Sequence, residues 1–555
     1  MKKTIQRFLG ALFALGLVAC GQASEDGEGG TGGTGGGGGG GGGTQVVDLE
    51  VSPLSLVLGI QQERKIEVVA KDADGEKVEV PVFFRSADPE IALVAGDGTV
   101  TGRSKGQTRI EIEAGKVGAV VAVTVEGAPA RLELPESVKV ALGRTFPIDV
   151  ILEDADGEDL DPAMLEWTSD DPGIAKVEEG EVVAVGWGET VLTARVNELE
   201  AFMTVRTLLR FSEIGVARDH TCGLTTVGTV YCWGLAREGR LGFETEEWQV
   251  VAPTRAVGNG ARFSALTVGS RHACALDDAG RARCWGANDA GQLGAPGESF
   301  SDSPKSVPGL LGLVAIASRG EQTCALDADG KAHCWGGPVG PQPTAVEGGP
   351  FVELAVGARH ACGLAEEGKV FCWGENGLGQ LGRSDLGASE EPVEVEGLAP
   401  MRAIAAGHDH VCGITEEGSL VHCWGSNSRG ELGRGSVGES GEPGQVHNPF
   451  AFKFLALGEA TSCAVSEGGT YCWGANDTNQ VGSDTVDPEI LVPTKIASGP
   501  WTFQKIYAGS RHTCGVTAQS EAYCWGDNSL GQLGVPSCDE ETDICLYPEY
   551  LIGQR

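Results

Sequence analysis

The chain has 555 residues, a formal net charge of −37 and 17 cysteines. A chain of this length exceeds what one hydrophobic core usually serves, so we expect several domains. So acidic a surface repels the phosphate backbone, and we therefore expect no nucleic-acid partner.

The N-terminus predicts export followed by lipid attachment. Basic residues at positions 2, 3 and 7 precede an apolar run over residues 8–18, which is too short to span a bilayer. The run ends in Leu17-Val18-Ala19-Cys20, which resembles the bacterial lipobox. The resemblance implies that residues 1–20 form a signal, cleaved before Cys20, and that Cys20 is lipidated. An ordinary signal peptide is the alternative.

A glycine-rich segment follows over residues 21–44. Such a segment cannot pack a core, and it predicts a disordered linker that holds the folded part clear of the lipid surface. Gly21 directly after the cysteine favours the outer membrane, by analogy with Gram-negative sorting. We therefore expect an extracytoplasmic protein at the cell surface, held to the membrane by its lipid anchor alone.

Residues 45–127 and 128–207 contain no cysteine and repeat one pattern twice. Apolar residues alternate along short stretches, with turns every eight to twelve positions, which predicts two β-sandwiches. The elements SADPEIALV and SDDPGIAKV resemble those of bacterial immunoglobulin-like group 2 domains. The resemblance implies spacers or adhesive modules on a surface protein.

Each copy carries the sequence Asp-Ala-Asp-Gly, beginning at Asp72 and at Asp154. A calcium loop would need its glycine at position six and a glutamate at position twelve. The glycine comes fourth here, as a hairpin turn requires. We predict turns, with calcium binding as the alternative.

Residues 208–555 contain the string Cys-Trp-Gly seven times, at intervals of about fifty residues and one shorter interval. One unit reads FVELAVGARHACGLAEEGKVFCWGENGLGQLG and predicts short strands at 351–356, 361–364 and 370–373. A sheet this small must bury its faces against neighbours, which predicts a seven-bladed β-propeller. The predicted fold class is all-β: two immunoglobulin-like sandwiches, then the propeller.

The motif GxxHxC, followed by CWGxN and GQLG, resembles the regulator of chromosome condensation repeat, and the resemblance implies the same seven-bladed propeller. Kelch repeats are the alternative, but their paired glycines are missing. The third unit departs from the motif at Gln322 and lacks GQLG, and the sixth unit has Thr461 in place of histidine. We expect residues 547–552 to supply a missing strand of the first blade and so to close the ring.

The cysteines pair within hairpins. Directly opposed residues of antiparallel strands lie close enough for a disulfide, whereas a metal site would need four ligands in one place. We predict eight disulfides, which implies an oxidising compartment. The pairs are Cys222–Cys232, Cys274–Cys284, Cys324–Cys334, Cys362–Cys372, Cys412–Cys423, Cys463–Cys472, Cys514–Cys524 and Cys538–Cys545.

One histidine position recurs, at His220, His272, His360, His410 and His512. We predict a structural role for it, with a central polyhistidine site as the alternative. The residue before it varies and is mostly charged, as in a scaffold that presents a variable ring. The repeat resemblance implies a protein-binding face here, one that engages a GTPase in one member of the family and a β-lactamase in a bacterial member. The candidate partner-binding residues are Asp219, Arg271, Glu321, Arg359, Asp409 and Arg511.

Signatures of common enzyme classes are missing from the sequence: G-x-S-x-G, H-E-x-x-H, a phosphate loop and a dinucleotide fingerprint. We therefore expect no enzyme activity, no cofactor and no metal. The expected function is a monomeric lipoprotein that presents a propeller to an unknown protein partner. The alternatives are guanine-nucleotide exchange, by analogy with the repeat, and an envelope polysaccharide-binding propeller.

Overall fold

The computed structural model describes residues 46–551, except 257–260, 418, 439, 448–449, 486, 498, 500–501 and 536–543. The predicted signal, Cys20, the glycine-rich linker and Cys538 lie outside the described residues. Helix is limited there to two 3-10 turns, η1 (Pro162–Met164) and η2 (Arg237–Gly239). No helix in the described part of the chain is long and apolar enough to cross a membrane.

The first module packs its sheets face to face over one core. One sheet has the order β2-β9-β8-β5, another has β3-β7-β6, and β1 pairs with β4. Leu58, Ile110 and Val123 from the first sheet meet Val100 from the second, and all four are fully buried. The strands are β1 (Asp48–Ser52), β2 (Ser55–Gly59), β3 (Glu63–Lys65), β4 (Glu67–Lys71), β5 (Val82–Ser86), β6 (Ala92–Val94), β7 (Thr99–Gly102), β8 (Gly106–Ala114) and β9 (Val117–Glu126).

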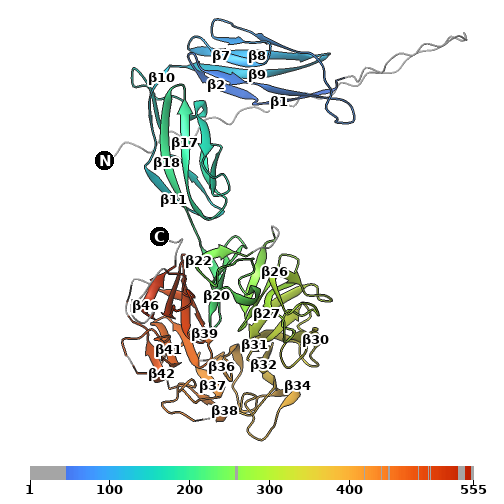
Figure 1. Cartoon of the computed structure of the whole chain (residues 1–555), viewed down its shortest axis with the longest axis vertical. Coiled ribbons are helices and arrows are strands. Elements are labelled where there is room, and N and C mark those ends of the chain that lie inside the picture. The colour runs from blue at the N-terminus through green and yellow to red at the C-terminus, as the bar shows by residue number, and fades with distance from the viewer. Residues whose placement is uncertain are drawn as a thin grey trace, which may run out of the picture.

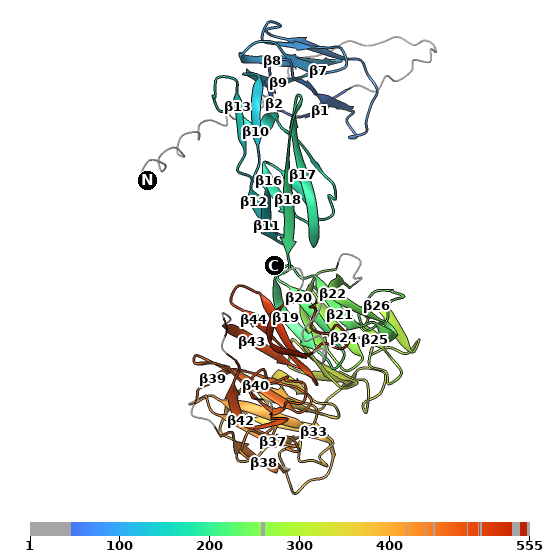
Figure 2. The same ribbon diagram turned by 60° about the vertical axis from the view of Figure 1, so that its left-hand side comes forward.

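The second module repeats this topology, with sheets β11-β18-β17-β14 and β12-β16-β15 and the pair β10–β13. Leu192 and Met203 from one sheet pack with Ala175 and Val182 from the other. Figure 2 shows this module between the first module and the propeller. Its strands are β10 (Pro129–Glu133), β11 (Ser137–Ala141), β12 (Thr145–Pro147), β13 (Ile151–Asp154), β14 (Glu166–Ser169), β15 (Ala175–Glu178), β16 (Glu181–Ala184), β17 (Gly188–Val196) and β18 (Leu199–Leu208).

The Asp-Ala-Asp-Gly segments are turns. The Oδ1 atom of Asp72 accepts the backbone N–H groups of Asp74 and Glu76, each at 3.0 Å. Asp154 does the same for Asp156 and Glu158, also at 3.0 Å. One carboxylate oxygen of each aspartate thus accepts hydrogen bonds from its own loop, as in an Asx turn.

Residues 211–551, as far as they are described, form seven four-stranded antiparallel sheets, each from four consecutive strands. Figure 1 shows these blades following one another in chain order around a ring. Blade 1 contains β19 (Phe211–Val216), β20 (His220–Thr225), β21 (Val230–Leu235) and β22 (Gln249–Arg255); blade 2 contains β23 (Phe263–Val268), β24 (His272–Asp277), β25 (Ala282–Ala287) and β26 (Phe300–Ser306); blade 3 contains β27 (Leu313–Arg319), β28 (Gln322–Asp327), β29 (Ala332–Trp335) and β30 (Thr344–Ala345). Blade 4 contains β31 (Phe351–Val356), β32 (His360–Ala365), β33 (Val370–Gly374) and β34 (Ser389–Glu394); blade 5 contains β35 (Met401–Ala406), β36 (His410–Thr415), β37 (Val421–Gly425) and β38 (Ser440–Gln445). Blade 6 contains β39 (Phe452–Leu457), β40 (Thr461–Ser466), β41 (Gly469–Ala475) and β42 (Glu489–Lys495); blade 7 contains β43 (Phe503–Ala508), β44 (His512–Thr517), β45 (Ala522–Asp527) and β46 (Ile544–Tyr550).

The predicted ring closure is wrong. The C-terminal strand β46 pairs with β45 of its own blade, and blade 1 already has its fourth strand in β22. The outer strand of each blade follows its own Cys-Trp-Gly strand in the chain, so the C-terminal strand completes blade 7 and not blade 1. The ring closes through contacts between blades 7 and 1, where the backbone N–H of Phe211 donates to the Ser520 carbonyl at 2.8 Å.

The tryptophan of Cys-Trp-Gly links five of the blades to the one before them. Its indole N–H donates to the carbonyl of the second residue of the preceding GQLG segment, and the ring is almost fully buried. Five such bonds, 2.8–3.1 Å long, join Trp233 to Gln532, Trp335 to Gln292, Trp424 to Gln380, Trp473 to Glu431 and Trp525 to Gln480. The bond from Trp233 runs from blade 1 to blade 7 and so closes the ring.

Seven disulfides join the second and third strands of the blades, at the pairs predicted from the hairpins. The paired cysteines stand directly opposite each other, with Cα atoms 4.0–4.1 Å apart. Cys545 is also disulfide-bonded, but its predicted partner lies outside the described residues.

The second module packs against the seam between blades 7 and 1. Its Leu142 and Trp187 join the apolar cluster of Phe211, Trp233 and Leu551. Trp187 also meets Tyr231 edge to face, with ring centroids 6.3 Å apart.

The tryptophan links allow a matched test of their contribution to stability. Trp424 donates to Gln380, whereas the buried indole N–H of Trp285 has no partner. Replacing either residue by phenylalanine removes similar packing, but only Trp424→Phe deprives a carbonyl of its donor. We expect Trp424→Phe to lower the free energy of unfolding by about 1–3 kcal/mol more than Trp285→Phe. Urea denaturation of the two variants measures the difference. An equal loss of unfolding free energy in both variants would contradict the proposed contribution of the hydrogen bond to stability.

Candidate functional site

The loops between the first and second strands of the blades gather at one end of the central channel. We call them the rim loops: residues 217–219, 269–271, 320–321, 357–359, 407–409, 458–460 and 509–511. The repeated histidine follows five of the rim loops and is completely buried, while Gln322 and Thr461 take its place in blades 3 and 6. In blades 2, 4 and 5 its ring lies over the loop's own glycine, where a Cβ on Gly357 would come within 2.1 Å of the His360 ring. Packing therefore favours glycine three positions before the histidine in these blades, whereas blade 1 has Ala217 there.

Three of the histidines hold neighbouring blades together. The Nε2 atoms of His272, His410 and His512 lie 2.7–2.9 Å from hydroxyls of Thr323, Ser462 and Thr221 in the next blade. Both ring nitrogens of His220 and His360 have no partner. In the blades that follow them, the corresponding position is alanine or valine. The side chains thus lie between blades, which supports the structural interpretation over a polyhistidine site.

The residue directly before each histidine position, here called the rim residue, has a fixed backbone. Its carbonyl accepts the backbone N–H of the residue after Cys-Trp-Gly, as from Leu235 to Asp219 at 2.8 Å and from Glu375 to Arg359 at 2.9 Å. The glycine between them has a positive φ, such as 106° at Gly234, and a Cβ there would come within 2.6 Å of that carbonyl. Six rim residues are therefore held at an equivalent place with side chains that vary, whereas in blade 3 the corresponding N–H, of Gly337, donates to the Ala290 carbonyl and not to Glu321.

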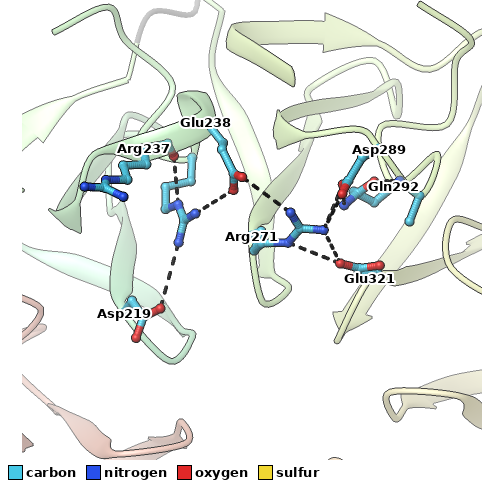
Figure 3. Close-up of polar contacts among 9 residues, drawn as sticks. Asp219, Arg237, Glu238, Arg271, Asp289, Gln292 and Glu321 are labelled. Carbon is cyan, nitrogen blue, oxygen red and sulfur yellow. Dashed lines mark hydrogen bonds and ion pairs between the residues drawn. The ribbon is translucent and has the colours of Figure 1, made fainter. Parts of the chain in front are cut away.

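Arg271 of blade 2 joins carboxylates from three blades (Figure 3). Its guanidinium lies 2.8 Å from Asp289, 3.2 Å from Glu321 of blade 3 and 3.5 Å from Glu238 of blade 1. Burial opposes the charge, but the hydrogen bonds to Glu321 and Asp289 outweigh it and raise the pKa of Arg271. Sequence reasoning placed Arg271 and Glu321 in a binding ring, and the structure gives both a role in joining blades.

The other candidate rim residues also have charged neighbours, but they differ in exposure. Arg359 pairs with Glu375 at 3.0 Å and is 59% exposed, which makes it the most accessible of the six. Arg511 lies 2.7 Å from the buried Asp527. A hydrogen bond from His408 at 2.7 Å lowers the pKa of Asp409. Asp219 lies 3.6 Å from Arg218.

A cavity of about 390 Å³ lies among the rim loops, at the mouth of the channel. Asp219 and Arg271 line it, together with Arg218, Arg319, His408, Glu459 and Ser510, which sequence reasoning missed. Glu321, Arg359, Asp409 and Arg511 are not among its lining residues. The missed residues stand two or three positions before the histidine. Aligning the seven loops over those positions would have shown charges where most units have a small residue.

Comparison with known proteins identifies the repeat. The model of the regulator of chromosome condensation (RCC1) repeat matches residues 227–276, 367–414 and 467–516, and a second model of this repeat matches residues 263–292, 351–380, 401–431 and 503–532. The chain therefore contains RCC1 repeats.

Solved structures show the same propeller fold. Yeast RCC1 (Prp20) in its complex with Kap60 gives a TM-score of 0.53 at 24% identity, over 62% of this chain and 85% of that chain. Human WBSCR16 gives 0.51 at 19% identity, over 58% of this chain and 92% of that chain.

Among curated proteins, the E3 ubiquitin-protein ligase HERC2 of Homo sapiens is 28% identical over 424 residues, which is 72% of this chain. The ultraviolet-B receptor UVR8 of Arabidopsis thaliana is 27% identical over 324 residues, or 57% of this chain. The chain spans 8% of HERC2 and 65% of UVR8.

The buried histidines predict acid sensitivity. Burial lowers the pKa of His360 to about 4, from 6.5. Its neutral form is therefore the folded one, while the unfolded chain takes up a proton below pH 6.5. Stability that is present above pH 6.5 is lost as the pH falls toward 4, by at most about 3 kcal/mol for this group.

His360→Gln, which copies Gln322 of blade 3, should reduce that loss by a similar amount. Urea denaturation at pH 7.5 and pH 4.5 measures it, with the exposed His447→Gln as the matched control. An unchanged pH dependence in the His360 variant would show that this histidine does not stay neutral in the fold.

Proposed function

We propose that this protein is an envelope lipoprotein whose RCC1-repeat propeller binds a partner protein through its rim loops. The observation that carries the proposal is the ring of rim residues: a backbone fixed by the same hydrogen bond in repeat after repeat, beside side chains that differ in charge. A rigid scaffold with variable polar loops is a common arrangement for recognition. The accessible Arg359 is the rim residue best placed to contact a partner.

The position of the second module supports this choice of face. It touches blade 1 at Val227, in the turn between β20 and β21. This turn lies at the opposite end of β20 from the rim loop at Asp219. Chain segments that run toward the N-terminus therefore leave the propeller away from the rim loops of blade 1, and the rim remains open to a partner.

The compartment is supported by chemistry on the rest of the chain. Seven disulfides need an oxidising environment to persist. Two β-sandwich modules of one topology fit the immunoglobulin-like spacers that the sequence suggested. In this proposal, the lipid on Cys20, the glycine-rich linker and the two modules carry the propeller outward from the membrane.

A second candidate is regulation of a GTPase. The X-linked retinitis pigmentosa GTPase regulator of Canis lupus familiaris is 30% identical to this chain over 138 residues, which is 24% of this chain and 14% of that protein. Accelerated release of a fluorescent guanine nucleotide from a GTPase of the same cell would support it. An exported, lipid-anchored chain would argue against it.

Charge reversal on the rim tests the binding face. Arg359→Glu should weaken capture of envelope proteins by the full chain at least about tenfold, because like charges across an interface are costly. Its melting temperature should hardly change, since exposed loop substitutions usually shift stability by less than about 0.5 kcal/mol.

Lys369→Glu is the matched control, because Lys369 is 50% exposed in the turn at the other end of the same hairpin. Quantitative capture with the wild type and both variants separates the two faces. Loss of capture in the Lys369 variant alone would show that the partner uses the other face.

Replacement of the anchor residue tests the location. Cys20→Ser should abolish incorporation of labelled fatty acid and release the protein from membranes, because acyl chains are the proposed attachment. Fractionation of cells that express either form measures the release. Continued membrane association of the variant would contradict anchoring by lipid alone.

A further inference from the structure

Blade 3 carries an arginine where other rim loops carry glycine. Three positions before the histidine position stand Gly269, Gly357, Gly407, Gly458 and Gly509, with Ala217 in blade 1 and Arg319 in blade 3. In a loop such as that of blade 4, the histidine ring fills the space that a side chain at Gly357 would need. Blade 3 has Gln322 instead of histidine. The loss of the ring removes that restriction and makes room for a large side chain.

The Arg319 side chain crosses the centre of the ring. Its Nη2 atom donates to the Leu457 carbonyl of blade 6, and β27 and β39, the strands of these two residues, lie on opposite sides of the ring in Figure 1. Arg319 lines both the cavity at the rim and the apolar channel below it. The guanidinium therefore forms the floor of the rim cavity.

Arg319 is half-buried, and its guanidinium has no counter-ion at ion-pair distance among the described residues. Its Nε is buried and has no hydrogen-bond partner, and Arg319 takes part in no ion pair with the described residues. Burial lowers the pKa of Arg319 to about 10, and the more distant Glu459 only partly offsets this. Buried charges are normally paired, because an unpaired one costs several kcal/mol. The carboxylates that line the cavity, Glu459 and Asp219, form no ion pair with Arg319 within the described residues.

The other basic side chains that line the cavity already pair with carboxylates of the chain. Arg271 holds three carboxylates, His408 pairs with Asp409 at 2.7 Å, and Arg218 lies 3.6 Å from Asp219. Arg319 is therefore the cation in this cavity that is left to bind an anion from outside. Glu459, on the cavity wall, forms no ion pair within the described chain.

We propose that the rim cavity binds a carboxylate group, which takes the place of the missing counter-ion on Arg319. A carboxylate accepts two parallel N–H bonds from a guanidinium. Glu459 and Asp219 in the lining disfavour a dianion such as phosphate, because like charges repel. The hydroxyl of Ser510 is available in the lining as a further donor. This inference stands whether or not the rim binds a protein.

Small probes test the site on the full chain. N-acetylglycine, a monocarboxylate, should bind at least about tenfold more tightly than its uncharged amide in a saturation-transfer NMR titration, because a hydrogen-bonded charge contributes about 1.5–3 kcal/mol. Phosphate should bind more weakly than N-acetylglycine. Equal binding of the acid and the amide, or tighter binding of phosphate, would overturn the proposal.

Three variants tie the binding to this cavity. Arg319→Gln should weaken N-acetylglycine at least about tenfold. Glu459→Gln should strengthen it, because it removes a repelling charge from an exposed side chain and leaves the fold unstrained. Arg109→Gln, in the first module, is the matched control and should change nothing. If Glu459→Gln leaves the affinity unchanged or lowers it, the proposal fails even where the Arg319 variant does not fold.

A peptide arm identifies the source of the carboxylate. A capped tripeptide with a central glutamate is compared with its glutamine counterpart. Binding of the glutamate peptide at least as tight as that of N-acetylglycine supports an acidic side chain on a partner protein. Binding of N-acetylglycine alone supports a free carboxylic acid. Binding of neither probe overturns the site.

Discussion

The propeller depends on one recurring hydrogen bond, from the tryptophan indole of a Cys-Trp-Gly segment to a backbone carbonyl of the blade before it. A four-stranded sheet has two apolar faces, and stacking them buries apolar area without fixing how one blade is turned against the next. The indole fixes it, because a buried donor must meet its acceptor at about 3 Å. Five of the blades make this bond in full, and Trp233 makes it to the far end of the chain at 3.0 Å.

Blade 3 shows what the structure does where the repeat fails. It lacks the GQLG segment that would accept from Trp373, which keeps only the stacking on Phe351, with ring centroids 5.8 Å apart, that Trp473 and Trp525 also make with their own phenylalanines. It also lacks the histidine, and Arg319 occupies the centre of the ring. Both departures fall in the blade with the shortest outer strand, β30. The least regular blade is thus the one that gives the central cavity its unpaired charge.

The repeat made most of the propeller predictable. The spacing of Cys-Trp-Gly indicated the number of blades, and the cysteine pairs indicated which strands form hairpins. The expected strands at 351–356 and 370–373 differ from β31 and β33 by at most one residue. The predicted ring closure was wrong because a periodic sequence pattern does not tell whether a strand ends one unit or begins the next. That choice depends on which neighbour pairs with it, and the outer strand pairs with β45 rather than with blade 1.

The candidate site was predictable only in part, for a different physical reason. Sequence alone shows which loop positions vary, but not which charges satisfy each other across blades. Arg271 and Glu321 were predicted as members of an open partner-binding ring, yet they pair with each other and form one network with Glu238. Sequence reasoning missed Arg319, because its position at the end of β27 and its direction into the ring appear only in the fold.

The seam between blades 7 and 1 explains why the second module is more than a spacer. Within the described residues no loop connects these two blades, and the contacts seen between them are non-covalent. The Thr221 hydroxyl lies 2.7 Å from the Nε2 atom of His512 and donates to the Gln532 carbonyl at 2.7 Å. The Trp233 indole donates to the same Gln532 carbonyl. These three hydrogen bonds adjoin the apolar cluster of Phe211, Trp233 and Leu551. Leu142 and Trp187 of the second module extend this cluster. The module therefore covers the one junction of the ring that the backbone does not secure, and its attachment stabilises the closed propeller.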